Sequence, residues 1–276
     1  MQTLYHYTDL NAFLSIIQQR KLWLTGVFNL NDSQEIYWAL NKIKDRLHDV
    51  RNKCGDNNAR DLWEMIENNS TEAYICSLSS DGDRLSQWRA YGQNGTGIAI
   101  GFKERSLPQF SRRPYLCMPI EESISLQKII YSDSEQEEMI TQVLKPLLDR
   151  GKSAKLTDPV LMVAAIELSA LTSIFKNHAF HEECEWRIVH RPLEFEKRDN
   201  ESADVILSIS PPKHRISGGK LVTYYEYSFD NIEYKDIFLE IILGPKCEAS
   251  VRDLSIFLMQ HGLESIKVKK SSASYR

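Results

Sequence analysis

The sequence of 276 residues predicts an α+β fold. Patterns typical of amphipathic helices crowd the first two-thirds of the chain, whereas short β-rich runs recur from one end to the other. These elements do not follow the regular βαβα order that predicts a doubly wound parallel sheet. We find no internal repeat, low-complexity tract or linker rich in proline and glycine. We therefore expect a single domain spanning residues 1–276, with a helical insertion around residues 134–177.

The first elements have the clearest signals. The stretch LYHYT alternates and is rich in aromatic residues, which predicts a strand, and Thr8 is placed to cap the helix that follows. That helix has one apolar face, formed by Leu10, Phe13, Leu14 and Ile17. We then expect strands at 21–26, 73–79 and 97–102, and helices at roughly 33–50 and 59–68.

The second half begins with a predicted strand near residues 126–132. Two long helices are expected at roughly 134–149 and 158–176, and Asp158 followed by Pro159 is a typical helix start. A last helix is expected to end at Gly262. The remaining β-rich runs predict strands at 183–190, 204–210, 221–228, 238–244 and 265–271.

Composition limits the class of protein. The net charge of −4 provides no global basic field for nucleic acid, although residues 102–114 and 267–276 are locally basic, a pattern more often found on a solvated face. The five scattered cysteines form no CxxC pair, which favours a reducing compartment. The longest apolar run, 159–175, contains Glu167, so we expect a buried helix and no membrane segment. Without a signal pattern at the N-terminus, the expected location is cytoplasmic.

Two stretches carry candidate catalytic residues. On a strand, His6 would point to one face and its neighbours Tyr5 and Tyr7 to the other, which fits a core histidine as well as the wall of a pocket. Glu183 and Glu185 lie two residues apart, so on a strand both carboxylates would face one side and one pKa should rise. Such a pair suits catalysis, although a solvated acidic loop before the strand is an equal alternative.

Other stretches are more ambiguous. Trp88 and Tyr91, at i and i+3, fit a stacking platform for a flat ring or a core pair. Asn31 and Asp32 in the stretch NLND fit a turn and a helix cap. The glycines near residue 95 lead into a strand, unlike a dinucleotide-binding loop. No phosphate-loop, nucleophile-elbow or zincin motif occurs. The histidines and cysteine of HAFHEEC have the helical spacing of metal ligands, but no fourth ligand is apparent.

Taken in order, several stretches resemble a bacterial family known as domain of unknown function 2971 (DUF2971). They are LYHYTDLNAFLSIIQQRKLWLT, NLND, CSLSSDGDRLSQWRAYGQNGTGIAIGF, FHEECEWRIV, ILGP and SSASYR, and together they cover nearly the whole chain. The pattern is similar to that of ADP-ribosyltransferases of the H-Y-E type, including toxins that modify DNA. Those enzymes carry a histidine on an early strand and a glutamate that opens a late strand. A clear Ser-Thr-Ser strand, which the comparison would lead one to expect, is not found here.

The resemblance implies a split antiparallel or mixed sheet with flanking helices, and NAD as a substrate. Glu185 would hold a ribose hydroxyl and stabilise the oxocarbenium charge that develops when nicotinamide leaves. Glu183 would orient or deprotonate the acceptor, a nucleic acid or a protein. The implied cofactor-binding residues are His6, Tyr7, Thr8, Asn31, Asp32, Trp88, Tyr91 and Arg187. Such an enzyme would fit a toxin or an anti-phage defence effector, with an antitoxin or inhibitor as a partner.

Two other functions stay open at this point. The fold would also suit a regulatory module that binds a nucleotide without catalysis, or a metal-dependent nuclease or hydrolase that uses His178 and His181. The first alternative is separated from the enzyme by geometry. The question is whether His6 and Glu185 face one pocket. If Glu185 is instead buried in a structural ion pair away from His6, the transferase hypothesis fails.

Overall fold

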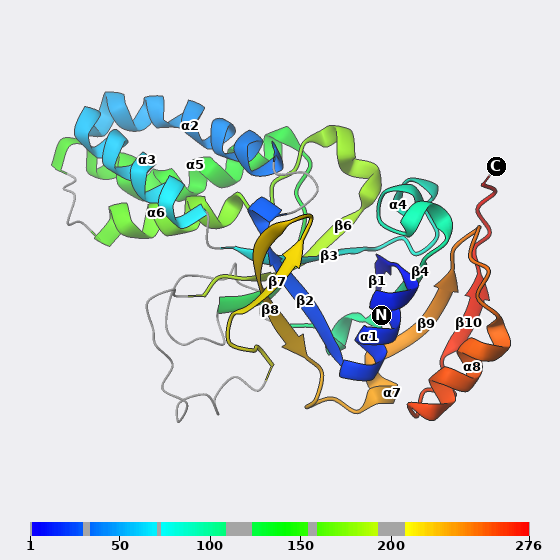
Figure 1. The fold of residues 1–276 in the computed structure, drawn as a ribbon. Coiled ribbons are helices and arrows are strands. Elements are labelled where there is room, and N and C mark those ends of the chain that lie inside the picture. The colour runs from blue at the N-terminus through cyan, green and yellow to red at the C-terminus, as the bar shows by residue number, and fades with distance from the viewer. Residues whose placement is uncertain are drawn as a thin grey trace.

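A computed structural model describes residues 2–29, 34–70, 73–108, 123–153, 159–192 and 208–275. Its centre is a mixed sheet of ten strands with several helices beside it, which confirms the predicted α+β class at that level (Figure 1). Eight strands follow the order β10-β9-β4-β1-β3-β2-β8-β7, and β6 pairs with β3 and with β5. Only the β10–β9 pair is parallel among the described strands.

Most strands occur where alternation or β-rich composition predicts them. The exception is β7, whose sequence KHRIS contains three basic side chains and gives no β signal. The strands are β1 (Thr3–Thr8), β2 (Lys21–Gly26), β3 (Tyr74–Ser79), β4 (Ile98–Lys103), β5 (Ile124–Lys128), β6 (Glu185–His190), β7 (Lys213–Ser217), β8 (Lys220–Ser228), β9 (Phe238–Leu243) and β10 (Lys267–Lys270).

The helices form two groups. Helices α2, α3, α5 and α6 pack together at one end of the molecule, whereas α1 and α8 lie beside the sheet (Figure 1). None of the helices in the described ranges is long and apolar enough to cross a lipid bilayer. The helices are α1 (Leu10–Gln19), α2 (Gln34–Cys54), α3 (Asp56–Ser70), α4 (Leu85–Ala90), α5 (Asp133–Arg150), α6 (Pro159–Leu171), α7 (Tyr234–Ile237) and α8 (Val251–Gln260).

The sheet diverges around β3. Along one edge, β3 pairs with β6 over its whole length. Along the other edge, β1 pairs with it only at Tyr5↔Ser79, and β2 only at Thr25↔Ile75 and Gly26↔Tyr74. The middle of this edge therefore has no partner among the described strands, and the backbone carbonyl of Ser77 there bonds to the side chain of His6. This divergence lies beside the candidate site described below.

Apolar side chains pack on both faces of the sheet. One cluster joins the strands to α1 and α8 through residues such as Phe13 and Leu258. The other joins α2, α3, α5 and α6 to the opposite face of β3 and β6, where Ile75 and Val189 are buried. Because β3 and β6 contribute to both clusters, their polar residues are held between two packed layers.

Several boundaries differ from the sequence predictions. Asp9, and not Thr8, caps α1, because its side chain accepts a hydrogen bond from the backbone of Ala12. The strand expected at 126–132 is β5, Ile124–Lys128. Helix α6 ends at Leu171, and the chain beyond it turns to pair with Ile130, so that Lys176 lies beside β6. Residues 204–207 of the strand predicted at 204–210 lie outside the described residues.

Candidate functional site

A cavity of about 260 Å³ lies beside the divergence of the sheet. His6 of β1, Tyr91 at the end of α4 and Glu185 of β6 all line it, although they are far apart in the sequence. A second cavity of about 70 Å³ shares these three residues and adds Tyr7 and Glu183. The predicted juxtaposition of His6 and Glu185 at one pocket is therefore present in the fold.

His6 has a defined tautomer in this pocket. Its Nδ1 lies 3.0 Å from the carbonyl oxygen of Ser77, and a carbonyl can only accept a hydrogen bond. Nδ1 therefore carries the hydrogen, and Nε2 is left as an acceptor in the neutral ring. Burial lowers the pKa of His6, partly opposed by the bond to Ser77, so the neutral form is favoured. A neutral imidazole with one available acceptor is suited to receive a hydroxyl group.

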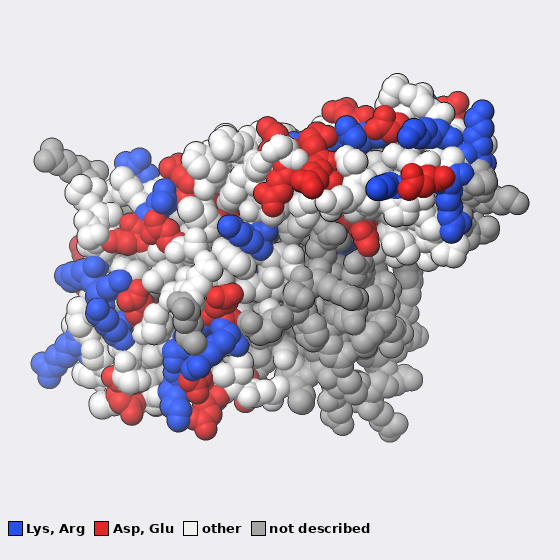
Figure 2. All heavy atoms as spheres, turned by 180° about the vertical axis from the view of Figure 1, so that it is seen from behind, with Lys and Arg blue, Asp and Glu red and all other residues white. Residues whose placement is uncertain are grey.

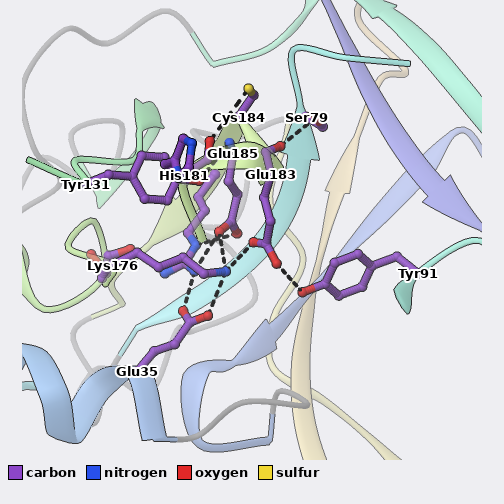
Figure 3. Close-up of polar contacts among 11 residues, drawn as sticks. Glu35, Ser79, Tyr91, Tyr131, Lys176, His181, Glu183, Cys184 and Glu185 are labelled. Atoms are coloured by element: carbon purple, nitrogen blue, oxygen red, sulfur yellow. Dashed lines mark hydrogen bonds and ion pairs between the residues drawn. The ribbon is translucent and has the colours of Figure 1, made fainter. Parts of the chain in front are cut away.

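A cluster of ion pairs forms one wall of the site (Figure 3). Its cations are Lys176 and Arg187. The Nζ of Lys176 lies 2.7 Å from Oε1 of Glu35 and 3.0 Å from Oε2 of Glu185, and it also bonds to Glu183. We call Glu35, Lys176, Glu183, Glu185 and Arg187 the ion-pair cluster. Its three carboxylates exceed its two cations by one formal negative charge.

Arg187 holds Glu185 in place. Its Nε lies 2.7 Å and its Nη2 3.0 Å from the two oxygens of that carboxylate, a two-pronged contact. The same guanidinium donates to Glu35 Oε2 at 2.6 Å and to the backbone carbonyl of Ser173 at 2.9 Å. Arg187, which the resemblance places among the cofactor-binding residues, therefore holds two glutamates through these contacts.

The two glutamates have opposite pKa shifts. Burial alone would raise the pKa of Glu185, but the charges of Arg187 and Lys176 and its hydrogen bonds lower it to about 2. For Glu183, burial and repulsion by Glu185 and Glu35 outweigh the attraction of Lys176, so its pKa is raised. The sequence predicts one raised pKa in this pair, and the structure assigns it to Glu183.

The carboxylates of Glu183 and Glu185 lie close together, but not because they share a strand, as predicted. Glu183 does not lie on the strand, because it ends a 3₁₀ helix, His178–Glu183, and β6 begins at Glu185. Between them Cys184 has the left-handed φ of 47°, unusual for a residue other than glycine. This kink redirects the chain, and both carboxylates then bond to Nζ of Lys176. The strand alternation expected for 183 and 185 is therefore wrong, although the pair still faces one cation.

Tyr91 lies in the pocket and Trp88 does not. Tyr91 is 38% exposed, and its hydroxyl lies 3.4 Å from Oε1 of Glu183. Trp88 is fully buried, packs edge-on against Tyr7 at 4.7 Å and donates from Nε1 to Asp83. The prediction that Trp88 stacks on a ligand is therefore wrong. Since α4 ends at Ala90, Tyr91 leaves the helical path and the i, i+3 spacing no longer places the two rings on one face.

Substituting these two aromatic residues by alanine should have different effects. We expect Trp88→Ala to lower the free energy of unfolding by about 3–5 kcal/mol, because it leaves a cavity in a packed cluster. Tyr91→Ala should change stability much less, because that ring is part-exposed. Urea unfolding of the two variants checks this. Equal destabilisation by both would contradict the assignment of Trp88 to the core and Tyr91 to the pocket.

The structure places the remaining predicted ligand-binding residues in three different situations. Tyr7 lines the smaller cavity, but its hydroxyl is occupied by the carbonyl of Asp81 and the backbone N–H of Arg84, which limits it to a wall of the pocket. Thr8 is buried at the end of β1 and lines neither of these two cavities, so the structure does not bring it together with His6 and Glu185. Asn31 and Asp32 lie outside the described residues.

Two members of the ion-pair cluster are not among the site residues that the sequence predicts. Lys176 follows the apolar run of α6, and Glu35 lies in the first turn of α2. Each is a single charged residue far from the others, and no spacing rule connects them to the Glu183–Glu185 pair. The only usable signal is a lysine at the end of an otherwise apolar run, where a buried charge needs partners.

The described residues do not assemble three or more His, Cys, Asp and Glu side chains that could hold a metal ion. The rings of His178 and His181 stack in parallel at 4.9 Å, and Nδ1 of His181 bonds to the backbone carbonyl of His178. These contacts join the two histidines to each other within their 3₁₀ helix, and neither histidine lines the cavity that holds Glu185.

Comparison with known proteins gives a family and no activity. Residues 87–188 match the model of a family described as "Protein of unknown function (DUF2971)". That segment includes Tyr91, Lys176, Glu183, Glu185 and Arg187. No curated protein and no solved structure matches the chain. This match over residues 87–188 agrees with the resemblance to DUF2971 noted in the sequence.

Proposed function

We propose that this protein transfers ADP-ribose from NAD to a nucleic acid or protein acceptor. The observation that carries the proposal is that His6, Tyr91 and Glu185 line one cavity beside the divergence of the sheet. Each of these residue types has a role in such a reaction. A regulated activity of this kind would suit a toxin or a phage-defence effector.

In the proposed reaction, the bond between nicotinamide and C1′ of the ribose breaks and nicotinamide leaves with the bonding electron pair. The ribose then carries oxocarbenium charge, which the excess negative charge of the ion-pair cluster would stabilise. The acceptor's nucleophile forms the new bond to C1′ and loses its proton. Glu183 suits the role of the base, because its raised pKa brings it closer to neutral pH than an ordinary glutamate.

His6 and Tyr91 would position the NAD. The free Nε2 of neutral His6 would accept a hydrogen bond from a hydroxyl of the adenosine ribose. The part-exposed ring of Tyr91 would stack on nicotinamide, a flat ring that is cationic before the bond breaks. Since the Tyr91 hydroxyl contacts Glu183, the same residue would link nicotinamide binding to the base.

Surface charge limits how a nucleic acid acceptor would bind. Figure 2 shows lysine and arginine in separate groups interleaved with acidic residues on the face seen from behind. In the C-terminal basic stretch, Lys269 is paired with Glu240 at 2.9 Å. The described part of this face offers no continuous basic band. We propose that an acceptor is held beside the smaller cavity, which Glu183 lines.

One observation favours a second candidate, a nucleotide-binding module without catalysis. Both carboxylate oxygens of Glu185 are occupied, one by Arg187 and the other by Arg187 and Lys176. A ribose hydroxyl would have to share these oxygens. This candidate predicts that NAD binds intact and that nicotinamide is never released.

The test uses NAD labelled in its adenosine part, incubated with the purified protein and with either nucleic acid or protein from a lysate. We expect nicotinamide release and transfer of the label. His6→Ala should weaken NAD binding about tenfold, because it removes one hydrogen bond in a buried site. His48→Ala, on the exposed surface of α2, is the matched control. Binding of NAD without release or transfer would favour the regulatory module.

A further inference from the structure

The cavity has a second charged end, where a cation lies apart from the ion-pair cluster. Arg215 of β7 lines it together with Trp23 and Thr25 of β2. Strand β8 lies between β7 and β2 in the sheet, so the side chain of Arg215 extends across β8 to reach β2. The cavity therefore runs along one stretch of the sheet, from Arg215 at one end to Glu185 at the other.

Aromatic rings hold Arg215 in place. Its guanidinium lies over the ring of Trp23 at 5.1 Å and over that of Tyr224 at 6.0 Å. Its Nη2 also contacts Oγ1 of Thr25 at 3.3 Å. Stacking uses the flat face of a guanidinium and leaves the N–H groups in its plane available. One of them, Nε, is buried and has no hydrogen-bond partner among the described residues.

Arg215 differs from the other cations of the cavity in its partners. Lys176 contacts three carboxylates, and Arg187 contacts two. Within the described part of the chain, Arg215 has no carboxylate within ion-pair distance. It is the one cation lining this cavity whose charge no described acid balances. A guanidinium at the edge of a cavity can donate two parallel N–H hydrogen bonds to the oxygens of a phosphate group.

We infer that Arg215, with Trp23 and Thr25, forms a subsite for the phosphate groups of a nucleotide that occupies the cavity. The identity of that nucleotide as NAD rests on the proposed function, in which Arg215 would bind the pyrophosphate while the ribose reaches His6. The subsite itself needs no catalysis. It requires only a ligand whose anionic part lies away from the carboxylates of the ion-pair cluster.

Calorimetric titrations with ADP-ribose, adenosine and inorganic pyrophosphate test the inference. We expect Arg215→Ala to weaken ADP-ribose and pyrophosphate about 10- to 100-fold and to leave adenosine unchanged, because only the first two carry phosphate. Arg215→Lys keeps the charge but loses the fork, so it should weaken ADP-ribose less. Lys220→Ala, on the same hairpin but outside the cavity, is the control.

The outcomes separate this inference from the proposed function. Binding of ADP-ribose that depends on Arg215, without any cleavage of NAD, would support the subsite and contradict the transferase. A folded Arg215→Ala that binds ADP-ribose as tightly as the wild type would overturn the subsite, whatever happens to NAD. Failure of the wild type to bind either phosphate-bearing probe would also overturn it. If the alanine variant does not fold, the Arg215→Lys variant provides the test. Unchanged affinity for ADP-ribose in that variant would contradict phosphate binding by the Arg215 guanidinium.

Discussion

Glu185→Gln is expected to lower the rate of nicotinamide release by about 10²–10³-fold, the usual effect of removing one group that stabilises transition-state charge. The substitution keeps the size of the side chain but removes one of the two negative charges that contact Arg187. It also takes away the excess negative charge of the ion-pair cluster. If the proposed function is correct, the oxocarbenium charge is then no longer balanced when the bond to nicotinamide breaks.

Stability must be separated from chemistry in this experiment. Glu185 is only 5% exposed, and removing one partner of a buried ion pair lowers stability by about 3–5 kcal/mol. Glu185→Asp therefore serves as a second variant, because it keeps the charge and shortens the side chain. Glu182→Gln, at the exposed neighbouring position, is the control. Release at the wild-type rate by a folded Glu185→Gln would exclude a catalytic role for this carboxylate.

Glu183 should give a different pattern if it acts on the acceptor. Glu183→Gln is expected to lower label transfer to the acceptor more than nicotinamide release, because water can replace the acceptor after the bond breaks. The two readouts come from the same reaction mixture. An equal loss of both would instead place Glu183 with Glu185 in bond cleavage.

The sequence predicts most of the strands and helices because their signals are local. The apolar face of α1 and the alternation of β1 lie within ten residues each, and both elements form where expected. Strand β7 was missed because its side chains are charged and its pairing comes from β8. The helix predicted at 158–176 is longer than α6, because the apolar run continues to Phe175 although the helix ends at Leu171.

The site was only partly predictable for a physical reason. His6 and Glu185 each occur in a recognisable stretch, so the resemblance could single them out. Glu35 and Lys176 belong to the same cluster only through tertiary contacts over long separations in the chain. The left-handed backbone conformation of Cys184 could not be predicted from the sequence, because residues other than glycine rarely adopt it. The partners of a buried charge are thus determined by the tertiary fold, and the spacing of residues along the sequence does not predict them.

Lys176→Met is expected to be the most destabilising substitution in the cluster, by about 3–5 kcal/mol at pH 7.5. Nζ of Lys176 contacts Glu35, Glu183 and Glu185. Without it, Glu35 and Glu185 keep only Arg187 as a cationic partner, and Glu183 keeps none among the described residues. Urea unfolding measures the loss. Lys235→Met removes a fully exposed lysine paired with Glu233 and should cause no measurable change.

The loss should shrink as the pH falls from 7.5 to 5. The pKa of Glu183 is already raised, and removing Lys176 should raise it further. A carboxyl whose pKa is higher in the folded than in the unfolded state destabilises the fold above that pKa, and the penalty is relieved as the group takes up its proton. In the wild type, Glu185 adds no pH dependence above pH 5, because its pKa is lowered to about 2 and its stabilising contribution is lost only below the unfolded value of 4.5. In the variant, Glu185 keeps its two contacts with Arg187. A loss that stays constant or grows toward pH 5 would show that Lys176 does not hold these carboxylates in their charged form.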